Sequence, residues 1–133
     1  MKVVKAAAVQ LSPVLYSREG TIEKVVRKIH ELGRQGVQFA TFPETVVPYY
    51  PYFSFVQSPY QIIVGPEYRK LLDQAVTVPS PATNAIGDAC RQAGVVVSIG
   101  VNEGGNWGQI FILDIHLLSL ISFPHEPPSS HPV

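Results

Sequence analysis

The sequence predicts an α/β fold, in which helices pack against a sheet of largely parallel strands. Residues 3–11 are a short apolar run rich in valine and alanine, which is typical of a strand buried on both faces. An amphipathic segment follows, and residues 37–42 form a second apolar run that stops at Pro43. A strand, a helix and a strand in this order form a βαβ unit, whose strands pair in parallel through a right-handed crossover.

The helix between these two strands is predicted from its periodicity. Ile22, Val25 and Ile29 recur at helical spacing, and charged residues occupy the opposite face. Thr21 is a candidate N-cap, because a threonine hydroxyl can accept a hydrogen bond from a free backbone N–H of the first turn. Gly36 lies where a glycine is expected to end the helix.

Later segments continue the alternation of helices and strands. Residues 43–65 hold several prolines and aromatic residues and are predicted to be a long loop, which is usually functional or part of an interface. Residues 66–76 are a predicted short helix, and a second helix runs from the capping pair Ser80-Pro81 to Gly94. Residues 95–101 are a third buried strand, and residues 109–115 are a candidate fourth.

The composition excludes several classes of function. Ten basic and ten acidic residues cancel, so charge gives no reason to expect nucleic acid or an anionic membrane as a partner. Charged residues make up 15% of the chain, below the usual share of about 25%, which predicts a large core or a covered surface. No apolar run reaches the length of about 18 residues that a membrane span needs. The single cysteine, Cys90, fits a reducing cytoplasm.

Glu44 is the clearest candidate for chemistry, because it directly follows the predicted strand at residues 37–42. Ligands of open α/β sheets gather at the carboxyl ends of the strands. Phe42 and the tyrosine-rich loop are expected to shield this carboxylate from water, and a desolvated carboxylate is a better general base near neutral pH. The alternative is a structural role in a turn or at a helix end, and the residues alone favour that alternative.

Short motifs along the chain bear on the choice between a catalytic and a structural role for Glu44. They are AAAVQLSP at residues 6–13, FPET at residues 42–45, VPYYPYFSF at residues 47–55, AVTVP at residues 75–79 and VSIGVNE at residues 97–103. Together they resemble the N-terminal part of the carbon–nitrogen hydrolase (nitrilase) superfamily, and the tyrosine-rich motif resembles true nitrilases rather than amidases or carbamoylases. The resemblance covers roughly residues 3–103 and implies the N-terminal portion of an α-β-β-α sandwich, incomplete in this chain.

The resemblance also implies a reaction. In this family the cysteine of a Glu-Lys-Cys triad attacks the nitrile carbon to give a thioimidate, while the glutamate acts as general base and the lysine stabilises negative charge. Water then releases a carboxylic acid and ammonia. By position Glu44 matches the family glutamate, and the expected contacts of a small-molecule nitrile are Tyr49, Tyr50, Tyr52 and Phe53.

The other two triad members have no counterpart in this sequence. No lysine or arginine follows Arg91. Cys90 falls on the apolar face of a predicted helix, beside Ile86 and Ala93, where a free cysteine is usually a small buried hydrophobe. A nucleophilic cysteine would need an accessible, electropositive position. We therefore interpret Cys90 as a core residue and expect no nucleophile in this chain.

We expect neither a metal nor a cofactor. His30 lies in the first predicted helix, whereas His116, His125 and His131 lie near the end of the chain, and their spacing matches no standard metal site. The glycines within residues 104–108 are interpreted as turn residues, because the lysine of a phosphate-binding loop is missing.

These observations predict a nitrilase-family enzyme chain. Residues 1–103 form the first part of the domain, and residues 104–133 are a divergent end with a disordered tail from about residue 124. We expect the chain to be truncated and inactive alone, and the intact enzyme to be a homo-oligomer. Two alternatives stay open: a non-catalytic fragment that associates with full-length subunits through uncovered sheet edges, and a cyanide-converting or amidase branch of the family.

Overall fold

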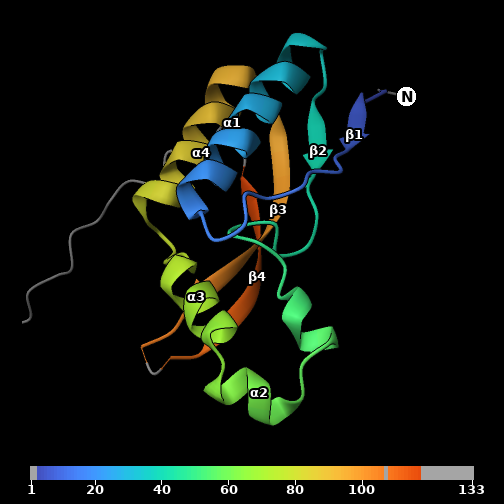
Figure 1. Cartoon of the computed structure of the whole chain (residues 1–133). Coiled ribbons are helices and arrows are strands. Elements are labelled where there is room, and N and C mark those ends of the chain that lie inside the picture. Colours follow the sequence, from blue (N-terminus) through green and yellow to red (C-terminus); the bar gives the residue numbers. More distant parts are fainter. Residues whose placement is uncertain (1–2, 107, 118–133) are drawn as a thin grey trace, which may run out of the picture.

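The computed structural model describes residues 3–106 and 108–117, which form a four-stranded sheet with helices on one face and at one end (Figure 1). The elements follow in the order β1 (Ala6–Ala8), α1 (Arg18–Arg34), β2 (Phe39–Thr41), η1 (Tyr52–Phe55), α2 (Pro59–Val64), α3 (Pro66–Gln74), α4 (Pro81–Ala93), β3 (Val96–Gly104) and β4 (Ile110–Leu117). The predicted α/β class is therefore confirmed.

The strands lie in the order β1-β2-β3-β4. β1 pairs in parallel with β2, where Ala7 lies opposite Ala40, and β2 pairs in parallel with β3, where Ala40 lies opposite Val97. β4 runs antiparallel to β3, with Ile99 opposite Ile115. The predicted βαβ unit is thus present, and β3 is joined to both a parallel and an antiparallel neighbour.

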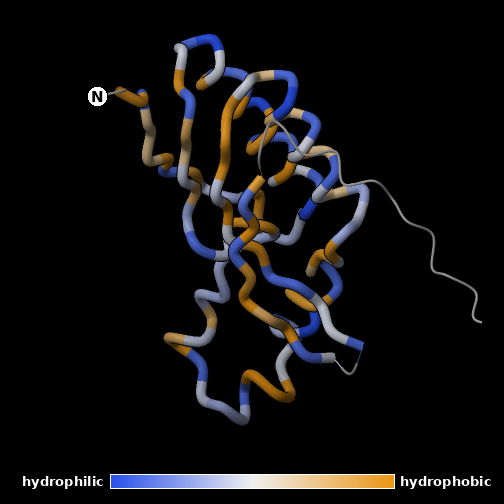
Figure 2. The backbone as a smooth tube through the Cα atoms, turned by 180° about the vertical axis from the view of Figure 1, so that it is seen from behind, coloured by the Kyte–Doolittle hydropathy of each residue, from blue (hydrophilic) through white to orange (hydrophobic). Residues whose placement is uncertain are grey.

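Helices α1 and α4 cover one face of the sheet (Figure 1). Their apolar sides meet alternate residues of the strands in a core that includes Val25, Ile29, Ile86, Val97 and Ile99. Figure 2 shows the sheet from the opposite side, with the helices behind it. Because successive strand residues point to opposite faces, the residues of β3 that alternate with this core point to the side away from α1 and α4.

β1 is shorter and more exposed than predicted. It spans three residues instead of nine, and both Ala6 and Ala8 are exposed. Among the residues that the structure describes, β1 is an edge strand paired with β2 alone, and nothing there covers its outer side or the face away from the helices. The apolar run at residues 3–11 was therefore wrongly predicted to be buried on both faces.

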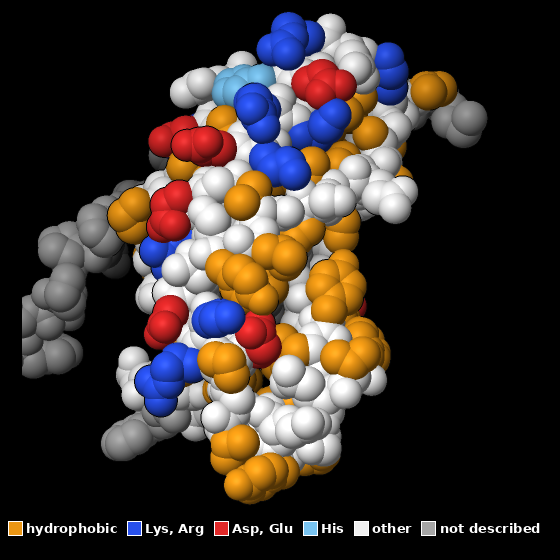
Figure 3. All heavy atoms as spheres, in the orientation of Figure 1, with side chains coloured by type: hydrophobic (Ala, Val, Ile, Leu, Met, Phe, Trp, Pro, Cys, Tyr) orange, Lys and Arg blue, Asp and Glu red, His pale blue; other side chains and the backbone are white. Residues whose placement is uncertain are grey.

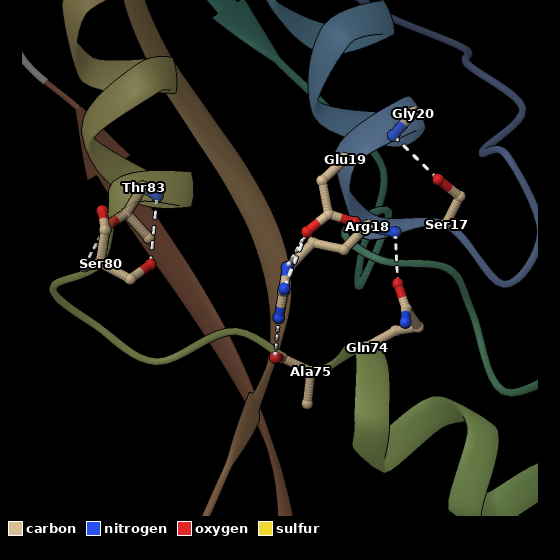
Figure 4. Close-up of polar contacts among 8 residues, drawn as sticks. All are labelled: Ser17, Arg18, Glu19, Gly20, Gln74, Ala75, Ser80 and Thr83. Carbon is tan, nitrogen blue, oxygen red and sulfur yellow. Dashed lines mark hydrogen bonds and ion pairs between the residues drawn. The ribbon is translucent and has the colours of Figure 1, made fainter.

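Helix α1 begins at a different cap from the one predicted. The Ser17 hydroxyl accepts the Gly20 N–H at 3.0 Å, as Figure 4 shows, so Ser17 is the N-cap. Thr21 lies inside the helix and is fully buried, and its hydroxyl accepts the Val14 N–H and donates to the Pro48 carbonyl. At the other end Gly36 has a φ of +75°, the left-handed conformation expected of a terminating glycine.

The start of α1 is tied to the end of α3. The Arg18 N–H donates to the Gln74 side chain at 2.8 Å, and the Arg18 guanidinium donates to the Ala75 carbonyl at 3.0 Å (Figure 4). The predicted cap of α4 is confirmed, because the Ser80 hydroxyl accepts the Thr83 N–H and the Thr83 hydroxyl accepts the Ser80 N–H.

The segment at residues 43–65 was predicted to be a long loop, and this prediction is wrong in part, because the segment contains η1 and α2. Helix α2 begins at Ser58-Pro59 with the same kind of capping box that starts α4. The following helix stops at Gln74, before the predicted end at residue 76, because Val76 pairs with Glu103 of β3 instead. The predicted tail lies outside the described residues. Within those residues, no helix is both long and apolar enough to cross a membrane.

Candidate functional site

Residues 43–46 are looped out of the sheet and form what we call the 43–46 turn. Just before this turn, the Phe42 N–H donates to the Ser98 carbonyl of β3 at 2.8 Å. Just after it, the Val47 N–H donates to the Gly100 carbonyl at 3.4 Å. Phe42 and Val47 are five residues apart, whereas their partners on β3 are two apart, so the extra residues must leave the plane of the sheet.

The 43–46 turn rests directly on Gly100. A Cβ atom at Gly100 would lie 2.3 Å from the Thr45 nitrogen and 2.8 Å from the Glu44 Cα. Thr45 has a φ of +46°, an uncommon conformation for a β-branched residue, and it is fully buried. Its hydroxyl has no hydrogen-bond partner among the described residues. The shape of the turn is therefore imposed by its surroundings.

The chain after the turn is held by hydrogen bonds to β3 and α1. The Asn102 N–H donates to the Val47 carbonyl at 2.8 Å, and the Asn102 side-chain amide donates to the Tyr49 carbonyl at 2.9 Å. On the α1 side, the Thr21 hydroxyl donates to the Pro48 carbonyl at 3.0 Å. Residues 47–49 are thus fixed on two sides. Glu44 lies before them, on the 43–46 turn that leaves the plane of the sheet.

A pocket of about 200 Å³ adjoins the turn. It is lined by Leu11, Pro13, Pro43, Glu44, Val46, Tyr50 and Tyr52. Glu44 is exposed, contrary to the expectation that Phe42 would shield it, because Phe42 is buried in the core instead. Four of the seven lining residues are aliphatic, and Glu44 is the one charged residue among them, since the wall contains no lysine or arginine and no cysteine either.

The aromatic residues expected at the substrate separate into two groups. Tyr50 and Tyr52 line the pocket, and the Tyr50 ring stacks on Phe55 with centroids 5.9 Å apart. Tyr49 is buried, meets Tyr16 edge-on, and is not part of the pocket wall. Burial raises the pKa of the Tyr49 hydroxyl to about 12. Phe53 is half-buried and also lies outside the pocket wall. A role of these four residues in substrate binding stays a prediction.

Cys90 lies on α4 and is completely buried in the core. Burial raises the pKa of its thiol to about 11, because the negative thiolate is poorly solvated there. A thiol that resists ionisation and cannot reach solvent is a poor nucleophile. Among the described residues, no three or more His, Cys, Asp or Glu side chains gather where they could hold a metal ion.

Gly100, Thr45 and Asn102 were not singled out from the sequence. A signal for Gly100 was present, because a glycine inside a run of valine and isoleucine often marks a close backbone approach. The buried Asn102 gave a weaker signal, since an amide among apolar strand residues needs a partner. Nothing local in the sequence indicates the left-handed conformation of Thr45.

The sequence matches the carbon-nitrogen hydrolase family over residues 5–115. The chain belongs to this family. It is 78% identical over 103 residues to Nitrilase 3 from an unknown prokaryotic organism, which covers 77% of this chain and 31% of that protein. It is 39% identical over 133 residues to a nitrilase from Paraburkholderia phymatum, covering 98% of this chain and 38% of that protein.

Cyanide hydratases are also similar to this chain. The cyanide hydratase of Botryotinia fuckeliana is 30% identical over 103 residues, which covers 77% of this chain and 27% of that protein. The chain thus spans about a third of the length of the curated relatives that it matches. The resemblance inferred from the motifs is confirmed, and the match to the carbon-nitrogen hydrolase family extends past residue 103 into β4, as far as residue 115.

Proposed function

We propose that this chain supplies Glu44 as the general base of a nitrilase-type active site. The overall reaction converts a small nitrile and water into a carboxylic acid and ammonia. The observation that carries the proposal is the placement of Glu44, which projects from a fixed turn after β2 and lines the adjoining pocket. Membership of the carbon-nitrogen hydrolase family and similarity to nitrilases support the reaction type.

In this mechanism Glu44 accepts the proton of the attacking thiol and passes it to the nitrile nitrogen as the thioimidate forms. The regenerated carboxylate then accepts the proton of the attacking water and passes it to the departing ammonia. An exposed carboxylate on a fixed backbone can reach both groups from one position. The lysine and the nucleophile are assigned to sequence outside these 133 residues, because no Lys or Arg follows Arg91 and the Cys90 thiol is buried. The 133-residue chain alone is therefore proposed to be inactive.

We further propose that Tyr50 and Tyr52 contact the nitrile. Both side chains line the pocket beside Glu44, and the remaining wall is mostly aliphatic. An apolar wall favours the hydrocarbon part of a nitrile through removal of its surface from water. Tyr49 is buried away from this pocket, so its proposed role is to support the loop.

A chimera tests the assignment of Glu44. The 103 residues of Nitrilase 3 that match this chain are replaced by the corresponding residues of this chain, and ammonia release from a set of nitriles is measured. Glu44→Gln should lower kcat by roughly 100- to 10,000-fold, the usual contribution of a general base. Glu23→Gln is the control, because Glu23 is exposed on α1. A chimera that keeps full activity with Glu44→Gln would contradict the proposal.

The same chimera distinguishes the branches of the family by their products. A nitrilase reaction releases acid and ammonia, whereas hydration of cyanide stops at formamide. The cyanide hydratase relatives make this comparison necessary. With cyanide as the substrate, accumulation of formamide without ammonia would place the chain in the cyanide-converting branch instead.

Association with a second copy is a further candidate role. No charged residue occurs at residues 45–66, and Phe55, Val56 and Ile63 in this segment are 72%, 83% and 80% exposed. Figure 3 shows hydrophobic side chains gathered around α2, away from the charged groups over α1. Two copies can meet through such a surface without repulsion between like charges.

Sedimentation velocity of the 133-residue chain tests this association. Ile63→Lys should shift the chain towards monomer, while Val3→Lys, at another exposed hydrophobic position, should leave the distribution unchanged. A wild-type chain that is monomeric at all concentrations would contradict self-association.

The buried, unpaired Cys90 supports a reducing compartment, so we include a cytoplasmic location in the proposal.

A further inference from the structure

We propose that Gly100 of β3 is a positioning residue for Glu44, and that it sets where the carboxylate stands by having no side chain. The inference rests on the proposed function of Glu44 as general base. Gly100 does not line the pocket, so its effect must pass through the 43–46 turn.

The contacts at Gly100 involve backbone, which cannot rotate away. A Cβ there would lie 2.3 Å from the Thr45 nitrogen, 2.8 Å from the Glu44 Cα and 3.0 Å from the Glu44 carbonyl carbon. Uncharged atoms in ordinary contact are about 3.5 Å apart or more. Any side chain at this position would therefore lift the turn by on the order of 1 Å.

The turn cannot absorb this shift at its two ends. Before the turn, the Phe42 N–H donates a hydrogen bond to the Ser98 carbonyl at 2.8 Å. After the turn, the Val47 carbonyl accepts a hydrogen bond from the Asn102 N–H at 2.8 Å. The displacement must then fall on residues 43–46, which carry Glu44. A reacting group displaced by about 1 Å can lose on the order of 100-fold in rate.

The conformation of Thr45 is an independent sign that the 43–46 turn depends on its packing against Gly100. This residue holds a left-handed φ of +46°, is fully buried, and has no partner for its hydroxyl among the described residues. Such a conformation is unfavourable for a β-branched residue and persists only where the surroundings enforce it. The close packing of Thr45 and Glu44 on Gly100 is such a constraint.

Gly104 offers a matched control on the same strand. A Cβ at Gly104 would meet the Ala75 Cβ at 3.3 Å and no atom of the 43–46 turn. Gly100→Ala and Gly104→Ala therefore make the same chemical change in β3, but only the first disturbs the packing of the turn that carries Glu44.

The kinetic experiment uses the active chimera with Nitrilase 3. Gly100→Ala should lower kcat by on the order of 100-fold and leave KM within about threefold, whereas Gly104→Ala should change neither by more than a few fold. In a Glu44→Gln background, Gly100→Ala should cause no further loss, because both changes act on the same group.

The outcomes separate this inference from the proposed function. If Glu44→Gln leaves activity intact, the assignment of the base fails. If Glu44→Gln abolishes activity but Gly100→Ala behaves like Gly104→Ala, the base assignment stands and the positioning role of Gly100 is refuted.

A second measurement needs no activity and uses the 133-residue chain itself. In ¹H–¹⁵N NMR spectra, Gly100→Ala should shift the amide signals of Glu44 and Thr45 by more than Gly104→Ala does, with the signals of α1 unchanged. Unchanged signals at residues 44 and 45 would overturn the proposal, even if the chimera carrying Gly100→Ala failed to fold.

Discussion

Replacement of Asn102 by alanine tests what holds the loop that follows Glu44. The Asn102 side chain is only 1% exposed, and its amide donates to the carbonyl of Tyr49, a residue that is itself 3% exposed. Asn102→Ala removes this donor and leaves the Tyr49 carbonyl without its side-chain donor in a buried place. Water cannot easily replace the lost donor where both residues are covered.

The expected loss of stability follows from two effects. A buried acceptor left without its donor costs about 1–3 kcal/mol. The smaller alanine side chain also leaves a void, which adds roughly 1 kcal/mol. We therefore expect the free energy of unfolding to fall by about 2–4 kcal/mol, a large share of the 5–15 kcal/mol typical of a domain. Asn102→Asp should be worse, because it places a negative charge against the Tyr49 carbonyl.

Urea denaturation of the 133-residue chain, followed by far-UV circular dichroism, measures this loss. Asn84→Ala is the matched control, since Asn84 is exposed on α4 and its replacement should change stability by less than about 0.5 kcal/mol. If Asn102→Ala proved as stable as Asn84→Ala, the hydrogen bond to Tyr49 would not be what secures the loop.

Three further predictions concern groups in or near the core. At pH 7, Cys90 should react with iodoacetamide on the order of 100-fold more slowly in the native than in the urea-unfolded chain, because a pKa rise from 9.0 to about 11 depletes the thiolate; equal rates would contradict its burial. Tyr49 ionises near pH 10 when unfolded but near 12 when folded, so stability falls as pH rises above 10, and Tyr49→Phe should lessen the loss measured by urea unfolding at about pH 11 relative to about pH 8. Ser80→Ala should lower the free energy of unfolding by about 1 kcal/mol in the same assay through loss of the α4 cap, and an unchanged midpoint would refute that role.

Local signals in the sequence predicted the helices and strands well where caps and periodicity agree. Ser80-Pro81 and Gly94 gave both ends of α4 because their conformations depend on immediate neighbours. The start of α1 was misplaced because Ser17 and Thr21 are both good capping residues. Only a tertiary contact decides between them: the Thr21 hydroxyl is bound to the Pro48 carbonyl, 27 residues away.

Helix α2 was missed although its signal was present. Ser58, Pro59 and Gln61 repeat the capping pattern that correctly indicated α4. The many prolines and aromatic residues around it favour a loop, yet proline is also favoured at the first position of a helix.

The position of Glu44 was predicted, but its setting was not. The motif at residues 42–45 indicated the residue, whereas its exposure depends on where the Phe42 ring packs. The close packing of the 43–46 turn on Gly100 arises from contact between segments that are distant in the sequence, and a local sequence pattern does not reveal such a contact. The exposure of β1 has the same origin, since burial depends on what covers each face of a strand.

The packing of the Glu44 turn on Gly100 also has a consequence for folding during biosynthesis. The two halves of the contact, Thr45 and Gly100, are 55 residues apart in the chain. During translation, α1 and β2 emerge long before β3, and closure of so long a loop is entropically unfavourable until the strand is available. The β3–β4 pairing, by contrast, joins neighbouring segments and can form as soon as both strands have emerged. We therefore expect the Glu44 turn to be among the last parts of the fold to form, and a nascent chain arrested before β3 to carry the glutamate without the strand that aims it.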